Sequence, residues 1–373
     1  MIPAELSGRR IAVVNWRDPW HPAAGGAETY AWEMATRFAS AGARVHFVTA
    51  RAPGQKRAET IDAVRLARMG GTFSVYILVL WWLLRRRGRF DAVLDCQNGI
   101  PFFTPWVLPR RTEVFCVVHH VHDRQFAVHL PHWLAVLGCF LEGPVSRWTY
   151  RRCASVAVSP STVLAMRERL GWTGAIHIVP NGVSLATRPR EPRSPSPRLV
   201  CVGRLVAHKR VDLLLDAVGD LRERWPDLTV DIIGRGPEEE RLRARLPEGV
   251  TFHGYLQVGD KERLIAAAWL QVNASQGEGW GLCVLEAAAL GVPTVAFDVD
   301  GLRDAVRHGE TGWLLPEGTE LAKGIATALD ELTETCSDRC REWAAGFDWD
   351  HSAERLARLL LGLPVSSGWE DGP

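Results

Sequence analysis

One stretch of this sequence, residues 268–293, constrains the fold more than any other. An apolar, strand-like segment (268–274) leads into a loop with three glycines, and a helix-forming segment (282–290) follows the loop. Gly291 and Pro293 end that helix, because neither residue continues a helix well. A strand, a glycine loop and a helix in this order are typical of parallel α/β proteins.

The glycine loop suits a phosphate. A helix that begins near Gly281 points unpaired backbone N–H groups, and the positive end of its dipole, into the loop. Glu278 lies in the loop and Glu286 lies in the helix. Two carboxylates flanking a phosphate site suit a ligand with hydroxyls on both sides of its phosphates, such as a nucleotide sugar. The alternative is an ordinary turn whose two glutamates are solvated.

The rest of the chain alternates strand-like and helix-like segments, which predicts parallel, doubly wound sheets. Its 373 residues are enough for two such domains. Four prolines between Thr187 and Pro197 indicate a linker. The predicted strands, from the first half and then the second, lie at 11–15, 44–49, 63–68, 91–96, 114–119, 155–159, 176–179, 198–202, 228–233, 250–254, 268–274 and 294–297.

Composition excludes several classes of protein. The net charge is +1, so nothing indicates a nucleic-acid partner. The eight cysteines are scattered without zinc or disulfide spacing, which predicts a reduced, cytoplasmic compartment. The chain enters its first strand almost at once, so we expect no signal peptide. Only four of its basic residues are lysines, which makes a lysine inside a motif more noticeable.

Two motifs in the first half are candidates for ligand contact. Gly25 and Gly26 open a predicted helix and let backbone approach a ligand, while Glu28 favours the helix dipole; alternatively they form only a permissive turn. His119, His120 and His122 follow a strand, where ligands bind in such sheets. An imidazole there can donate a hydrogen bond to a sugar hydroxyl.

A third motif follows the first strand of the second half. Arg204 and Lys209 flank a loop that begins at Gly203, placed to meet a pyrophosphate. Arginine does so in bidentate geometry and lysine as a point charge. Two solvated cations are the alternative interpretation.

Taken in order, these motifs resemble family 4 of the retaining glycosyltransferases, above all the Glu278 to Glu286 signature with Gly-Trp-Gly inside it. The resemblance spans nearly the whole chain. It implies the α/β GT-B fold, with two Rossmann-like, doubly wound domains facing a central cleft. The expected divisions are an acceptor domain (1–186), a linker (187–197), a donor domain (198–346) and a C-terminal segment (347–373) whose helix crosses back to the first domain.

The resemblance also assigns roles. Arg204 and Lys209 are expected to hold the diphosphate, Glu278 to contact the donor hexose and Glu286 the ribose. One histidine contacts the hexose in this family, and we favour His122 over His119. The remaining expected donor contacts are Gly26, Gly203, Gly281, Leu282 and Cys283. The remaining expected acceptor or cleft residues are Gly25, Glu28 and Asn181.

The predicted function is transfer of a hexose from a nucleoside-diphosphate sugar to a hydroxyl, with retention of anomeric configuration. The acceptor would be a cell-envelope glycan, a lipid or a natural product; the donor base and the sugar stay open. The alternatives are a nucleotide-sugar epimerase of GT-B fold and a catalytically silent, nucleotide-sugar-binding partner of another transferase.

No cofactor or metal is expected. Asp298 and Asp300 imitate the metal motif of a different glycosyltransferase fold, and we interpret that match as coincidence. Asp300 departs from the small residue that the family places there, which leaves the shape of the donor-sugar pocket open.

The most apolar segment, 73–84, is followed by four arginines within five residues. It is too short to cross a bilayer, which takes about 20 residues. It predicts either a helix buried against a sheet or a contact of residues 73–89 with a membrane surface. The protein is therefore expected in the cytoplasm, or peripherally at the inner face of the membrane.

Overall fold

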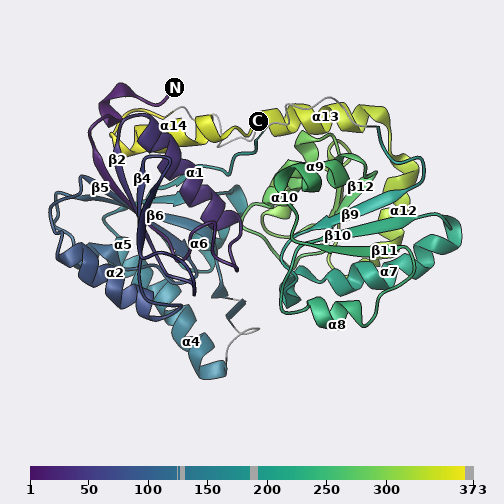
Figure 1. Cartoon of the computed structure of the whole chain (residues 1–373), viewed down its shortest axis with the longest axis horizontal. Helices are drawn as coiled ribbons and strands as arrows, with labels where there is room; N and C mark the ends of the chain where they lie inside the picture. The colour runs from purple at the N-terminus through teal and green to yellow at the C-terminus, as the bar shows by residue number, and fades with distance from the viewer. Residues whose placement is uncertain (124, 127–130, 185–191, 366–373) are drawn as a thin grey trace. The chain divides into compact units, whose positions relative to one another are not determined.

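The computed structural model describes residues 1–123, 125–126, 131–184 and 192–365 (Figure 1). The chain forms two compact units: unit 1 comprises 1–182 and 349–373, and unit 2 comprises 183–348. The expected division at residue 186 and the first part of the expected linker, 187–191, lie outside the described residues.

Unit 1 is built on an eight-stranded sheet in the order β3-β4-β2-β1-β5-β6-β7-β8. Its neighbouring strands are parallel, except that β3 runs against β4. The strands are β1 (Arg10–Val14), β2 (Arg44–Thr49), β3 (Ala58–Ile61), β4 (Val64–Arg68), β5 (Ala92–Asn98), β6 (Glu113–His120), β7 (Ala154–Ala157) and β8 (Ile176–Ile178).

The helices of unit 1 include both its early helices and the last helix of the chain. They are α1 (Gly26–Ser40), α2 (Ser74–Leu84), α4 (His132–Phe140), α5 (Ser146–Tyr150), α6 (Pro160–Glu168) and α14 (Trp349–Leu360). The last helix packs on the first: Arg37 of α1 donates to Asp350 of α14 over 2.6 Å, and the rings of Tyr30 and Trp349 meet edge to face. The C-terminal helix therefore belongs to unit 1 (Figure 1).

Helix α2 is apolar on two sides. Val75, Val79 and Leu83 are buried, while Ile77 and Trp81 are 73% and 51% exposed. The expected burial of segment 73–84 is thus correct for one face only. The helix carries apolar residues on all of its sides, so no periodic pattern in the sequence distinguishes its exposed face from its buried face.

Unit 2 is built on a fully parallel six-stranded sheet in the order β11-β10-β9-β12-β13-β14. Counted from β9, this is the 3-2-1-4-5-6 order of a Rossmann fold, and the order reverses between β9 and β12. The strands are β9 (Arg198–Val202), β10 (Thr229–Ile233), β11 (Val250–Gly254), β12 (Leu270–Asn273), β13 (Thr294–Phe297) and β14 (Gly312–Leu315).

Helices cover both faces of this second sheet. On β9, Leu199 packs in one core cluster with Leu214 of α7, and the next residue, Val200, packs in another with Ile265 of α9. Successive strand residues point to opposite faces, so both faces are buried. The helices are α7 (Val211–Arg224), α8 (Glu239–Arg243), α9 (Val258–Ala266), α10 (Leu282–Ala289), α11 (Leu302–Ala305), α12 (Leu321–Glu331) and α13 (Glu334–Ala345).

Candidate active site

The candidate residues of unit 2 gather where its strand order reverses. Gly203 and Arg204 follow β9, Ser275 follows β12, and these two strands are neighbours. Together with Lys209 they line a small hollow at the carboxyl ends of the two strands. This is the edge of an open α/β sheet at which ligands bind.

A partly buried ion pair lies at the centre of this group. The Lys209 ammonium donates to Oε1 of Glu278, and the Ser275 hydroxyl donates to the same oxygen over 2.7 Å. The side chains of Lys209 and Glu278 are 18% and 15% exposed. Asn273 fixes Ser275 in turn, because its Oδ1 accepts the Ser275 backbone N–H at 3.1 Å.

Both members of the pair are charged at neutral pH. Burial by itself would raise the pKa of Glu278, but Lys209 and Ser275 outweigh burial, so the pKa lies below its usual value. Burial would likewise lower the pKa of Lys209, and Glu278 turns the net shift upward. Unit 2 therefore carries a fixed, oriented pair of charges beside the hollow.

Glycines bring the neighbouring loops close to this pair. A Cβ on Gly234 would lie 1.8 Å from the carbonyl oxygen of Gly203, and one on Gly236 would lie 2.1 Å from that of Leu205. The loop after β10 can therefore pack directly on the loop that carries Arg204. Arg204 is itself exposed, yet near enough to Lys209 for its charge to oppose the upward shift of the lysine pKa.

The loop after β13 supports Glu278 from another side. The backbone N–H of Glu278 donates to the carbonyl of Asp300 over 2.9 Å, and a Cβ on Gly301 would lie 2.3 Å from the Glu278 carbonyl oxygen. The Asp298 side chain accepts from Arg303 at 2.9 Å. Asp300 thus holds the Glu278 loop through its main chain.

Helix α10 begins directly after this loop. Gly281 precedes it in the left-handed conformation (φ 82°), which glycine adopts without strain, and Leu282 and Cys283 form its first turn. Burial raises the pKa of the Cys283 thiol to about 11, so the thiol is neutral. Further along the helix, Glu286 accepts from Lys261 of α9 at 2.8 Å.

In unit 1, Glu28 fixes the start of α1. Its Oε2 accepts the backbone N–H of Gly25 at 2.7 Å, and the side chain is buried. Gly25 is the N-cap in extended conformation, and Gly26 is the first helical residue. Glu28 therefore shapes the turn in which both glycines lie.

His119 lies at a bulge near the end of β6, where the register with β5 shifts between Gln97 and Asn98. Burial lowers the pKa of His119 to about 3, and its Nε2 has no hydrogen-bond partner among the described residues. Tyr30 of α1 packs edge-on against the ring, with centroids 5.0 Å apart. His119 is thus a neutral, enclosed imidazole.

His122 is more accessible than His119, with 20% of its side chain exposed. Its Nδ1 lies 3.0 Å from the carbonyl oxygen of His120. A carbonyl only accepts, so Nδ1 carries a proton, and in the neutral form of the ring this leaves Nε2 as the acceptor. The backbone N–H of His122 donates to the carboxyl group of the buried Glu142 at 2.7 Å.

Asn181 also belongs to unit 1 and is buried, with Oδ1 unpartnered among the described residues. Its neighbour Gly182 touches the first residue of α14: a Cβ on Gly182 would lie 2.4 Å from the backbone nitrogen of Trp349.

The structure thus places the predicted residues in two groups, one in each unit. Sequence reasoning missed three of their partners, Ser275, Lys261 and Glu142. Lys261 is one of only four lysines, and that scarcity was the one signal that pointed to it. Ser275 and Glu142 carry no motif of their own.

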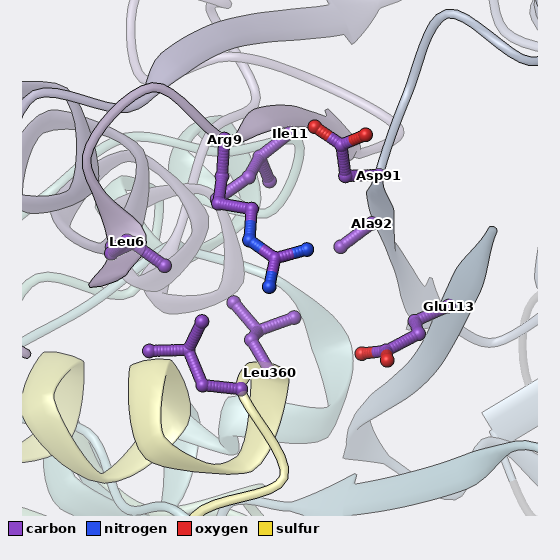
Figure 2. Close-up of a pocket in the computed structure, with 8 residues that line it drawn as sticks. Leu6, Arg9, Ile11, Asp91, Ala92, Glu113 and Leu360 are labelled. Carbon is purple, nitrogen blue, oxygen red and sulfur yellow. The ribbon is translucent and has the colours of Figure 1, made fainter.

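A second hollow lies at the amino ends of the strands of unit 1, the end of the sheet opposite to the histidines (Figure 2). Ala92 and Glu113 begin β5 and β6, and Arg9 extends into the space between these strand starts and Leu360 of α14. Since the histidines lie at and just after the carboxyl end of β6, this hollow is separate from the candidate site.

Within the part of the chain that is described, no three His, Cys, Asp or Glu side chains are grouped closely enough to share a metal ion. The absence of a metal remains a prediction. No helix among the same residues is long and apolar enough to cross a membrane.

Comparison with known proteins covers both units. Residues 24–187 match the description "Glycosyltransferase Family 4", and residues 196–334 match "Glycosyl transferases group 1". A phosphatidyl-myo-inositol mannosyltransferase of Mycobacterium leprae is 30% identical over 319 residues, which cover 81% of this chain and 80% of the relative.

Solved structures share the fold. Sucrose-phosphate synthase of Thermosynechococcus elongatus matches with a TM-score of 0.80 and 20% identity, covering 95% of this chain and 98% of that one. Anabaena HepE in complex with UDP-glucose matches with a TM-score of 0.74 and 18% identity, covering 95% and 100%. With the Rossmann order of unit 2 and the sequence relative above, these matches show that the chain is a glycosyltransferase of family 4 with the GT-B fold.

Proposed function

We propose that this enzyme moves a hexose from a nucleoside-diphosphate sugar to an acceptor hydroxyl and retains the anomeric configuration. The observation that carries the proposal is the partly buried Lys209–Glu278 pair beside Arg204 at the strand-order reversal of unit 2. Two cations and a helix start suit a diphosphate, and carboxylates suit sugar hydroxyls.

In the proposed reaction the leaving diphosphate helps to deprotonate the acceptor hydroxyl on the same face of the sugar. Lys209 and Arg204 stabilise the charge that develops on the leaving group, together with backbone N–H groups at the start of α10. Glu278 orients the hexose and Glu286 the ribose. His122 lies near the reacting carbon.

The names of the relatives support this class of donor and acceptor. HepE was solved with UDP-glucose, and the Mycobacterium leprae relative is named as a mannosyltransferase acting on a phosphatidylinositol. We extend to this chain only a nucleotide sugar as the donor, which the first name supports, and transfer of a sugar, which the second supports.

The first test is thermal stabilisation by UDP, GDP, ADP and dTDP, each alone, on wild type and on Glu286→Ala. A nucleotide at 100 times its Kd should add about 2.7 kcal/mol of stability. We expect one nucleotide to stabilise wild type strongly and the variant much less. If no nucleotide stabilises wild type, the proposal fails.

The second test uses sugars of the nucleotide so identified. Proton NMR of the product reports whether the anomeric configuration of the donor is kept. A changed nucleotide sugar without any acceptor would favour an epimerase, and binding without turnover against every acceptor would favour a silent partner.

We also propose that residues 73–89 contact the inner face of an anionic membrane. Ile77 and Trp81 present an exposed apolar face on α2, and the guanidinium of Arg85 lies 4.0 Å from the Trp81 ring centroid. Apolar side chains beside arginines suit a lipid interface. The variant Ile77→Ser/Trp81→Ser should lose flotation with phosphatidylglycerol vesicles.

The matched control changes two exposed apolar residues of unit 2, Tyr255→Ser/Val258→Ser, which are 68% and 63% exposed. Equal flotation of the two double variants would contradict a membrane contact through α2.

A further inference from the structure

Glu142 is a buried carboxyl group that the proposed reaction does not use. It lies in a π-helical turn, Leu141–Val145, between α4 and α5, and its side chain is fully buried. Single π-helical turns occur frequently at functional sites. Oε1 accepts the backbone N–H of His122, and Oε2 has no hydrogen-bond partner among the described residues.

The same oxygen, Oε1, lies close to the His122 ring. It is 3.8 Å from Nδ1, which is too long for a hydrogen bond. Nδ1 faces the carbonyl of His120 instead, at 3.0 Å. The ring therefore has two acceptors near Nδ1, and the one it uses depends on the charge of Glu142.

We propose that Glu142 is a positioning residue for His122: its neutral carboxyl group fixes the turn after β6 through the His122 backbone N–H and leaves Nδ1–H on the His120 carbonyl. Nε2 then remains the acceptor nitrogen of the neutral ring, in the orientation that the turn gives it. This inference rests on the proposed function, because it needs His122 near the reacting carbon.

The charges around Glu142 are consistent with a neutral carboxyl group. Burial raises the pKa of Glu142 to about 8, against the opposing effect of the His122 N–H. Cys139 of α4 faces it, and burial together with Glu142 raises the pKa of that thiol. Beyond His122, the carboxylate of Asp123 is paired with Arg169.

Ionisation of Glu142 is expected to move the ring. A carboxylate attracts Nδ1–H more strongly than a neutral acid does. The hydrogen bond of Nδ1–H should therefore change its acceptor from the His120 carbonyl to Oε1 of Glu142. The acceptor Nε2 then turns away from its position. We therefore expect kcat of wild type to fall above pH 8, with little change in the KM of the donor.

The test compares Glu142→Gln and Glu142→Leu with wild type in the full chain. A glutamine side chain is neutral and still accepts the N–H, so Glu142→Gln should keep kcat within about threefold at pH 7 and should lack the fall above pH 8. Leucine cannot accept the His122 N–H. Glu142→Leu should therefore lower kcat about tenfold, the effect expected when one hydrogen bond is lost. Asp95→Asn, which changes a buried carboxyl of β5, controls for general loss of stability.

A readout independent of turnover is the 15N NMR signal of His122, identified by its absence in His122→Ala. It should move with a midpoint near pH 8 in wild type and not in Glu142→Gln. If the signal still moves with a midpoint near pH 8 in both Glu142 variants, as in wild type, the proposal is wrong. A Glu142→Leu variant with wild-type kcat would also overturn it. If wild type transfers no sugar at all, the proposed function fails instead, and the NMR comparison still tests the contact between Glu142 and His122.

Discussion

At the scale of single residues, the Lys209–Glu278 pair is the feature of unit 2 on which the proposed reaction depends. Removing one partner leaves the other charge partly buried and without its ion-pair partner, which costs stability. We therefore interpret the pair as part of the binding machinery.

We expect Lys209→Ala to lower the transfer rate between about tenfold and a hundredfold, because charge-assisted hydrogen bonds contribute about 1.5 to 3 kcal/mol. Initial rates at saturating acceptor give the measurement. Lys323→Ala is the control: that lysine is also paired with a glutamate, Glu320, but is 78% exposed. Near-normal turnover by folded Lys209→Ala would remove Lys209 from the site.

Gly301 allows a second prediction at this scale. Gly301→Ala should displace the Glu278 loop, since its Cβ would lie 2.3 Å from the Glu278 carbonyl, and should weaken nucleotide binding at least about tenfold. Gly309→Ala is a matched control, because Gly309 has almost the same φ (76° against 75°) and nothing within 4 Å of its Cβ. Both variants place a side chain at a positive φ, which is strained for any residue other than glycine. Equal nucleotide affinity in the two variants would show that the close approach is unimportant.

His119 gives a prediction on pH. Its pKa in the folded protein is about 3, below the ordinary value of 6.5, so the unfolded chain binds the proton first as pH falls. Stability from this residue is complete above pH 6.5 and decreases toward pH 3, by about 2 kcal/mol at pH 5. Thermal unfolding of His119→Gln should depend less on pH between 7.5 and 5 than that of wild type. The exposed His351→Gln should unfold with the wild-type pH dependence.

At the scale of secondary structure, apolar runs predicted most strands of both sheets within one or two residues. Two strands escaped. β3 alternates exposed and partly exposed residues at a sheet edge, so it carries no buried run by which a strand is recognised. β14 is mostly buried, but it begins with a glycine and contains no β-branched residue, so its composition does not favour a strand.

The candidate site was predictable only where its residues belong to motifs. Glu278 and Lys209 were found through their loops, but their direct contact depends on strands β9 and β12 lying side by side. Glu142 lies 20 positions from His122 in the sequence, inside an apolar helical run. Only the packing of the π-helical turn under the end of β6 brings the two together.

At the scale of the whole molecule, unit 1 is assembled from both ends of the chain. Gly182→Ala should destabilise unit 1 by about 1 to 3 kcal/mol, since the added Cβ would lie 2.4 Å from the backbone of Trp349. The midpoint of thermal unfolding gives the measurement. Gly174→Ala, with nothing within 4 Å of its Cβ, should unfold like wild type. A Gly182→Ala variant as stable as wild type would mean that α14 can shift without loss.

The place of α14 has a consequence for biosynthesis. The two ends of unit 2 are joined by a bridge between Val183 and Asp348, so this unit is complete once the ribosome has added residue 348. Unit 1, although begun first, still lacks the helix that packs on α1. Unit 1 therefore obtains its full set of elements only after every residue of unit 2 has been synthesised.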